Sequence, residues 1–354
     1  MPAVVGADAD AEPAVELTHL FLWPHSGCNC RCAMCDIWLD RSRRTIDPAD
    51  VEEWAKEWER LGVRFVSLTG GEALMHREIW RIAAILRDHG IRIALMSTGI
   101  TLARHAEAAV RHCGLVVVSL DGPPQVHDAV RRIPNAHRKL AEGVAELRRH
   151  RPSFPVFGRC AVHRLNFRHL RETVEFSRQL ELTRLSFLAT DVTSEAFNRP
   201  GGWAADRQEA IALADDDLPE LEEELDRLEA ECRADFESGL IMDPPQALRT
   251  KLLGFYRAHN GLGEFPPVRC NAPWASAVVE VDGTVRPCFF HEPYGNVHEA
   301  GSLEAVLASP KAVAFRRELD VRTNPICRRC VCPQTYPRHS ETATPSSLAA
   351  AAAG

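Results

Sequence analysis

The chain has 354 residues, a net charge of -7 and a pI near 6.1. This length supports about two domains and a large core, while the absence of a long Lys/Arg block argues against nucleic acid as a partner. No apolar run is long enough for a membrane span. The first residues lack the basic start and apolar core of a signal peptide, so the twelve cysteines predict metal ligands in a reducing, cytoplasmic compartment rather than disulfides.

Strand-like apolar runs alternate with amphipathic helical patterns through the first part of the chain. The expected strands cover residues 18–23, 63–69, 91–98, 115–121, 155–163 and 184–190. The helical patterns between them cover residues 48–61, 77–89, 101–112, 137–150 and 168–181. Six βα repeats with short loops predict a parallel α/β sheet, either doubly wound or curved into a barrel. In a barrel, functional residues gather in the loops that follow the strands.

The later part of the chain has a different pattern. Residues 204–235 are acidic but repeat Leu at helical spacing, which favours a solvated helix over a metal or partner site. The segment ASAVVEVDGTVRPCFF, with Asp282 and Gly283 at its turn, predicts a β-hairpin, and two short helices are expected near 302–319. A disordered leader, a barrel, a small hairpin-and-helix domain and a disordered Pro/Ser/Ala-rich tail are predicted at 1–16, 17–240, 241–333 and 334–354.

Three cysteines follow the first expected strand in the segment GCNCRCAMCDIW. Cys28, Cys32 and Cys35 have the spacing C-x-x-x-C-x-x-C, which supplies three thiolates to one 4Fe-4S cube and leaves the fourth iron open. An open iron implies that a substrate or cofactor binds there. A structural zinc site is the alternative, although zinc favours paired C-x-x-C units with four ligands.

The cysteine motif resembles that of the radical S-adenosylmethionine (SAM) enzymes. The resemblance implies an open, partial (β/α)6 version of the TIM barrel and a cluster whose open iron chelates SAM for reductive cleavage to a 5'-deoxyadenosyl radical. In this family a GGE after the second strand holds the amino group of SAM, which corresponds here to Gly70, Gly71 and Glu72. The residue before the third cysteine is commonly aromatic. Here it is Met34, whose thioether can still pack on adenine.

Polar residues at the ends of later strands are implied to complete the SAM site. By resemblance they hydrogen-bond the ribose and the methionine carboxylate, and Leu188 packs on the adenine. The set expected to bind SAM is Met34, Gly70, Gly71, Glu72, Ser97, Thr98, Ser119, Asp121, Arg131 and Leu188. Two candidate catalytic residues are added: Arg159, directed into the barrel by strand alternation and able to grip a carboxylate, and Asp191, a candidate substrate contact after the sixth strand.

A second cysteine set lies in the C-terminal part. Cys270 and Cys288 flank the hairpin as C-x12-G-x4-C, and Cys327 with Cys330 form C-x-x-C. Four thiolates close a 4Fe-4S cluster completely, and the arrangement resembles the twitch domain, the short relative of the SPASM domain. A structural zinc is the alternative, and Cys332 can replace Cys330 or remain free. The other cysteines are interpreted as spare or buried thiols: Cys30, Cys113, Cys160 and Cys232.

Together these features predict a radical SAM enzyme with three cofactors: SAM, its 4Fe-4S cluster and one auxiliary 4Fe-4S cluster. The small cysteine set and the short leader favour hydrogen abstraction from a small polar metabolite, such as a sugar, aminocyclitol or nucleoside, leading to dehydrogenation, epimerisation or decarboxylation. Modification of a peptide or protein side chain is one alternative, and a non-enzymatic metal-binding scaffold is another. The expected partners are the small-molecule substrate and a reducing donor such as flavodoxin or ferredoxin, without nucleic acid or membrane.

Overall fold

A parallel sheet forms the centre of the computed structural model, which describes residues 17–336. Its first six strands are β1 (His19–Leu22), β2 (Phe65–Leu68), β3 (Arg92–Ser97), β4 (Leu115–Ser119), β5 (Val156–Val162) and β6 (Arg184–Ala189). Each strand pairs in parallel with the next one along the chain. Their residues are apolar without strict alternation because both faces of a covered parallel sheet are buried.

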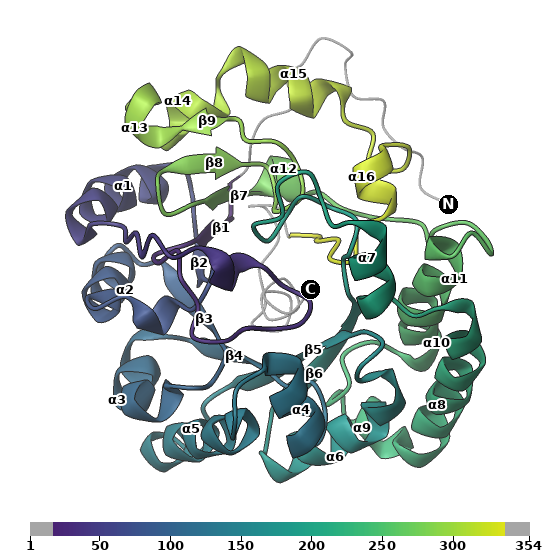
Figure 1. Cartoon of the computed structure of the whole chain (residues 1–354). Helices are drawn as coiled ribbons and strands as arrows, with labels where there is room; N and C mark the ends of the chain where they lie inside the picture. Colours follow the sequence, from purple (N-terminus) through teal and green to yellow (C-terminus); the bar gives the residue numbers. More distant parts are fainter. Residues whose placement is uncertain (1–16, 337–354) are drawn as a thin grey trace.

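Helices surround the outside of this curved sheet, as Figure 1 shows. They are α1 (Pro48–Arg60), α2 (Ile79–Asp88), α3 (Leu102–His112), α5 (Ala136–His150) and α6 (Leu170–Gln179). The helix α4 (Pro124–Arg131) lies nearer the opening of the barrel, where its carbonyls accept hydrogen bonds from the loop after β1. The start of α1 follows from its sequence, since Asp47 accepts a hydrogen bond from the Ala49 amide at 2.9 Å and proline suits the first helical turn. The helix α4, which begins directly after Pro123, was not predicted from the sequence.

The C-terminal hairpin extends the same sheet. Strand β7 (Ser276–Val279) pairs in parallel with β1, and β8 (Thr284–Arg286) and β9 (Gly295–Asn296) continue in antiparallel fashion. The strand order is β6-β5-β4-β3-β2-β1-β7-β8-β9, so β6 and β9 are the two edges and the barrel is open. The predicted partial barrel with a small C-terminal hairpin and helix domain is confirmed.

Further helices cover the region between β6 and β7. The acidic stretch forms α7 (Ala205–Ile211), α8 (Leu218–Glu231) and α9 (Arg233–Glu237) rather than one helix. A continuous helical segment follows as α10 (Pro245–Arg249), a π-helical turn (Thr250–Gly254) and α11 (Phe255–His259). Tyr256 of α11 donates a hydrogen bond to the carbonyl of Val162 at 2.6 Å, so this segment packs on the barrel.

Short elements complete the described chain. The C-terminal helices are α12 (Ala272–Ala275), α13 (Val297–Ala300), α14 (Leu303–Leu307), α15 (Pro310–Glu318) and α16 (Pro325–Arg328). Single 3-10 turns lie at Ile37–Leu39, Ala73–Met75, Phe167–His169 and Asp215–Asp217. Tyr336 is buried, so ordered structure continues past the expected boundary at 333. The predicted disorder of 1–16, and of the tail from 337 onward, lies outside the described residues.

The two largest apolar cores of the described residues flank the sheet. One fills the space between the strands and the helices α1, α2, α3 and α5, and it continues to the C-terminal helices α13 to α15. The other lies between β5, β6 and the helices α6, α8 and α11, and it includes Cys30, Cys32 and Met34 of the loop after β1. This loop is therefore packed into the body of the protein, and in Figure 1 it curls across the opening of the barrel.

Candidate functional site

The loop after β1 carries the first cysteine set at the carboxyl edge of the parallel strands. Each of the three sulfur atoms accepts a hydrogen bond: Cys28 from the Cys30 amide (3.5 Å), Cys35 from the Ile37 amide (3.5 Å), and Cys32 from Nη1 of Arg131 (3.4 Å). Such donors stabilise thiolates. None of the described cysteines forms a disulfide. The three sulfur atoms are therefore available as the three thiolate ligands of a 4Fe-4S cube.

The three thiols differ in their electrostatic surroundings. Burial raises the pKa of Cys28, and it raises the pKa of Cys35 to about 12. A hydrogen bond from the Cys30 thiol, together with the charge of Arg131, holds the pKa of Cys32 below its usual value. Within residues 17–336, no three His, Cys, Asp or Glu side chains are grouped as the ligands of a single metal ion. A cubic cluster spaces its thiolates more widely than one ion does.

The GGE turn after β2 packs directly against this loop. A Cβ atom added to Gly71 would lie 2.1 Å from the carbonyl oxygen of Gly27, a distance that no side chain tolerates. The same carbonyl accepts a hydrogen bond from the Glu72 amide at 3.0 Å. Gly70 has φ +99°, a conformation that favours glycine. The two glycines therefore fix the distance between the GGE turn and the cysteine loop.

Glu72 is buried at the carboxyl edge of the strands, and residues at the end of β3 donate hydrogen bonds to its carboxylate. Its Oε2 accepts hydrogen bonds from the Thr98 amide and hydroxyl, both at 2.7 Å, and from the Ser97 hydroxyl at 3.2 Å. Burial raises the pKa of Glu72, and these hydrogen bonds oppose the rise. The structure thus brings together three of the residues expected to bind SAM. A bound ammonium group would supply a positive counter-charge for this buried carboxylate, whose hydrogen-bond donors are neutral groups.

Asp121, at the end of β4, reaches the cysteine loop through Arg131. Nε of Arg131 donates to Oδ2 of Asp121 at 2.6 Å, and both side chains are buried. Asp121 Oδ1 and Asn29 Nδ2 are buried polar atoms without a hydrogen-bond partner within the described chain. Unpaired buried polar atoms usually mark a missing ligand or water, which fits a polar cofactor at this edge. Ser119 is partly exposed, in register with Arg159.

Asp191 forms a buried ion pair with Arg199, a residue that sequence analysis missed. Nη1 of Arg199 lies 3.0 Å from Oδ2 of Asp191 and donates to its backbone carbonyl at 2.9 Å. Nη2 donates to the carbonyl of Met34, and the guanidinium stacks on Trp203 at 3.8 Å. Asp191 therefore anchors the cysteine loop through Arg199. No local pattern in the sequence marks the role of Arg199, because its contact with the cysteine loop at Met34 spans 165 residues.

An inner cavity of about 180 Å³ joins the carboxyl edge of the barrel to the C-terminal cysteines. From the barrel it is lined by Gly70, Met96, Arg159 and Leu188, and from the C-terminal part by Cys270, Cys288, Cys327, Cys330 and Cys332. Arg159 is thus inside the barrel, facing the second cysteine set. The lining is mostly apolar, which suits a space from which water is excluded.

The second cysteine set is contacted mainly by its own neighbours. The Cys332 amide donates to Cys330 Sγ at 3.4 Å, and Nε2 of Gln334 lies 3.2 Å from Cys332 Sγ. Nε2 of the buried His291 lies 3.3 Å from Cys327 Sγ. Burial raises the pKa of Cys288 to about 12 and that of Cys327 to about 11. His291 also escaped sequence analysis, although it follows Cys288 by only three residues.

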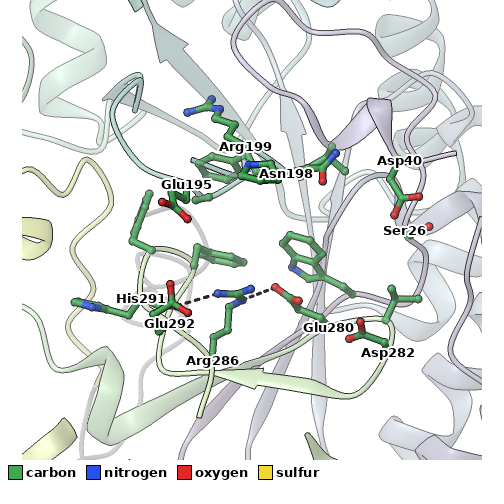
Figure 2. A pocket seen from close by; sticks show the side chains of 18 of the residues that line it. Ser26, Asp40, Glu195, Asn198, Arg199, Glu280, Asp282, Arg286, His291 and Glu292 are labelled. Carbon is green, nitrogen blue, oxygen red and sulfur yellow. Dashed lines mark hydrogen bonds and ion pairs between the residues drawn. The ribbon is translucent and has the colours of Figure 1, made fainter. Parts of the chain in front are cut away.

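An outer cavity of about 360 Å³ lies between the cysteine loop, residues 195–200 and the hairpin (Figure 2). It shares Trp23, Ile37, Phe197, Phe289, Phe290 and His291 with the inner cavity. Acidic side chains surround it, among them Glu195 and Glu292. Arg286 is held by Glu280 at 2.7 Å, and Arg44 by Asp282 at 2.9 Å.

Comparison with known families supports both halves of this arrangement. Residues 24–177 match the radical SAM superfamily, and residues 270–331 match the SPASM iron–sulfur cluster-binding domain. The chain contains a radical SAM domain followed by a SPASM domain. Members of this superfamily are enzymes, and the two domains imply a SAM-binding 4Fe-4S cluster, SAM and auxiliary iron–sulfur chemistry. The three- and four-cysteine sets described above fit these groups.

Curated relatives resemble parts of the chain. The AdoMet-dependent heme synthase of Methanosarcina barkeri is 26% identical over 44% of this chain, and the PqqA peptide cyclase of Ruegeria pomeroyi is 25% identical over 77% of it. The chain spans 45% of the length of the synthase and 66% of that of the cyclase.

None of the helices among residues 17–336 combines the length and the apolar composition that a membrane span requires.

Solved structures share the fold across most of the chain. SuiB of Streptococcus suis bound to S-adenosylmethionine matches with a TM-score of 0.63 and 13% identity, covering 91% of this chain and 74% of SuiB. The enzyme anSMEcpe with bound AdoMet and a peptide matches with a TM-score of 0.64 and 18% identity, covering 89% of this chain and 88% of that one. At these identities the likeness concerns the fold of the radical SAM and SPASM domains.

Proposed function

We propose that this protein is a radical SAM enzyme that modifies a side chain of a peptide or protein. The observation that carries the proposal is the continuity of the two cavities, which share six lining residues. An extended chain can rest in the outer cavity while one side chain enters the inner one. That side chain then lies between the barrel edge and the second cysteine set.

The relatives that match most of the chain support a peptide substrate. The PqqA peptide cyclases of Ruegeria pomeroyi and Rhodopseudomonas palustris align with 77% and 86% of it, and SuiB bound to its precursor peptide SuiA has the same fold. The sequence patterns alone favoured a small polar metabolite, partly because the cysteine set is small. The match of residues 270–331 to the SPASM domain weakens that argument, so the peptide alternative is now favoured.

The residues of the barrel edge have distinct roles in this proposal. Cys28, Cys32 and Cys35 hold the cluster, and Glu72 pairs with the amino group of SAM. Bound together, the cluster and SAM supply a carbon radical that removes one hydrogen atom from the substrate. Arg159 lines the inner cavity, where it positions an acceptor group of the substrate or of SAM. The apolar lining excludes water from the reacting carbon.

The charges around the outer cavity favour a peptide with a cationic group near the modified residue. Arg44 and Arg286 are engaged by carboxylates. Glu195 and Glu292, in contrast, form no ion pair with any residue of the described chain. Two uncompensated carboxylates at a partly enclosed entrance attract a lysine, an arginine or a free amine.

The proposal is tested with reconstituted, anaerobic protein, SAM and dithionite. Peptides encoded next to the gene are compared with aminocyclitols and sugars, and 5'-deoxyadenosine and the peptide mass are measured. We expect a peptide to stimulate 5'-deoxyadenosine formation and to lose two hydrogens, or to exchange one hydrogen with solvent if it is epimerised. A variant with Cys28, Cys32 and Cys35 changed to Ala is the control without SAM cleavage. Stimulation by a sugar or aminocyclitol, but by no peptide, would overturn the proposal.

A further inference from the structure

An open depression of about 850 Å³ lies on the outer side of the cysteine loop. Its lining comes from three parts of the chain: the loop itself, from Gly27 to Arg43, Met75 of the turn after β2, and residues 132–134 after α4. Four arginines line it, namely Arg31, Arg41, Arg43 and Arg132, with Asp40 as the acidic residue among them. In a chain with a net charge of -7, this is a local reversal of charge.

The four arginines are exposed and available to a partner. None of them forms an ion pair with a carboxylate among residues 17–336, whereas Asp40 is paired with Arg44 at 3.5 Å. Many exposed arginines elsewhere are paired along their own helices, for example Arg111 with Glu107. Keeping several like charges together without counter-charges costs folding energy, which suggests that another molecule supplies the counter-charges.

The depression lies next to the ligands of the SAM-binding cluster. Cys28, which is partly exposed, belongs to its lining. Trp38 also lines it and donates a hydrogen bond from Nε1 to the carbonyl of Cys35 at 2.8 Å. An electron that enters here reaches the cysteine loop without crossing the barrel.

Docking at this depression leaves the substrate path open. Asp40 is the one residue that lines both the depression and the outer cavity. No residue of the depression lines the inner cavity that faces the second cysteine set. A protein can therefore bind at the arginines while a substrate occupies the two cavities.

We propose that this depression is the docking surface for a small acidic protein that carries one electron at low potential. The reduced carrier loses one electron to the oxidised cluster held by Cys28, Cys32 and Cys35, and no atom or proton is transferred. Carboxylates around the redox centre of the carrier pair with the arginines, which steers its approach and orients that centre towards Cys28. The inference rests on the radical SAM cluster of the proposed function but not on the nature of the substrate.

The experiment uses an acidic flavodoxin in its fully reduced form and the anaerobic, cluster-loaded protein. Cluster reduction is followed by stopped-flow absorbance at low and high salt. We expect the variant Arg41→Glu/Arg43→Glu/Arg132→Glu to be reduced at least about tenfold more slowly at low salt, within the range for electrostatic steering. Added salt should slow the native protein and leave the variant nearly unaffected, because the attraction is screened.

Two controls separate docking from damage. Dithionite, which needs no docking, should reduce the cluster of the variant and yield 5'-deoxyadenosine from SAM as in the native protein. The matched variant Arg149→Glu/Arg233→Glu/Arg317→Glu changes the net charge equally at exposed positions on other helices and should stay within about twofold of the native rate. Should the triple reversal fail to fold, the milder Arg41→Gln/Arg132→Gln variant should still show an intermediate rate.

Four outcomes would overturn the inference. If flavodoxin reduces the triple variant at the native rate at low salt, and dithionite also reacts normally, the docking surface is rejected while the radical SAM assignment stands. Equal slowing in the matched variant would show that net charge, not this depression, governs the encounter. If the triple variant instead loses binding of an acidic peptide substrate and keeps its rate with flavodoxin, the arginines bind substrate. If dithionite gives no 5'-deoxyadenosine in the native protein, the radical SAM assignment fails together with the inference.

Discussion

The two cysteine sets differ in what holds their sulfur atoms in place. The first set is held by distant parts of the barrel: α4 receives backbone hydrogen bonds from the loop at Arg31 and Ala33 (3.1 and 3.0 Å), and Arg131 donates to Cys32. The second set is held by contacts among the C-terminal segments themselves, such as His291 with Cys327 and Gln334 with Cys332. One site is built into the barrel, and the other is assembled within the C-terminal part.

This difference implies different dependence on iron. A site whose ligands are already positioned loses little order when the metal is absent, whereas ligands on short segments gain much of their order from the metal. We therefore expect the cysteine loop to be preorganised and the second set to be ordered largely by its cluster. The following changes test each half of this contrast.

Replacing Arg131 should have the largest effect. Arg131→Gln leaves the carboxylate of Asp121 buried without its partner, and breaking a buried ion pair on one side costs about 3–5 kcal/mol. It also removes the donor to Cys32, so the first cluster should be lost more readily than the second. Chemical denaturation and iron analysis measure both effects. Arg131→Lys should restore part of the stability, and equal loss of both clusters would contradict the assigned difference.

Gly71→Ala should displace the cysteine loop. The added Cβ would lie 2.1 Å from the carbonyl oxygen of Gly27, and overpacking of this kind costs about 1–3 kcal/mol. We expect weak loading of the first cluster and normal loading of the second, as measured by iron content and electron paramagnetic resonance. Gly114→Ala is the matched control, because its Cβ meets only one atom, at 3.8 Å, and its φ is not positive. Native loading in Gly71→Ala would show that the loop can move without cost.

The sequence was sufficient for features that depend on neighbouring residues. The strands follow from buried apolar runs, and the two cysteine sets follow from their spacing. The helix α4 was missed because Pro123 and Pro124 after a glycine resemble a turn, although proline also suits a helix start. The roles of Gly71 and Arg199 could not be predicted from local patterns, since Gly71 contacts Gly27 and Arg199 contacts Met34, 165 residues away.

Removing iron should affect the two regions unequally. In the apo protein, amide hydrogen exchange should rise clearly in residues 270–292 and 320–336 and much less in the loop around Cys32, because that loop keeps its hydrogen bonds to α4. Anaerobic chelation followed by exchange mass spectrometry provides the comparison, with α2 as an internal reference. Equal loss of protection in both regions would mean that the two cysteine sets do not differ in how far they are preorganised.

Serine substitutions decide which cysteine completes the second set. We propose Cys330 as the fourth ligand, because its sulfur accepts the Cys332 amide at 3.4 Å, a donor typical of a bound thiolate. Cys330→Ser should lose about half of the bound iron, as expected for one of two 4Fe-4S clusters, while Cys332→Ser should keep it. The reverse result would assign the ligand to Cys332.

The stability of the contact between β1 and the C-terminal part should depend on pH. His19 of β1 contacts Tyr336 of the C-terminal part, with ring centroids 5.1 Å apart, and its Nε2 lies 2.9 Å from the Ser67 hydroxyl. Burial lowers the pKa of His19 from 6.5 to about 3. Between these values the unfolded chain binds the proton and the folded one does not, so stability falls as the pH drops below 6.5. One pH unit below that value, the loss is about 1.4 kcal/mol.

The variant His19→Phe/Ser67→Ala isolates this contribution. It removes both hydrogen-bonding partners and leaves neither buried polar group unpaired, so its stability at about pH 7.5 should be close to native. Other buried histidines, such as His163, have lowered pKa values as well and weaken both proteins alike in acid. The native protein should therefore lose about 1 kcal/mol more than the variant on going to about pH 5.5, as measured by chemical denaturation. Identical losses would mean that His19 accepts its proton without unfolding, and the contact between β1 and the C-terminal part would be looser than its burial implies.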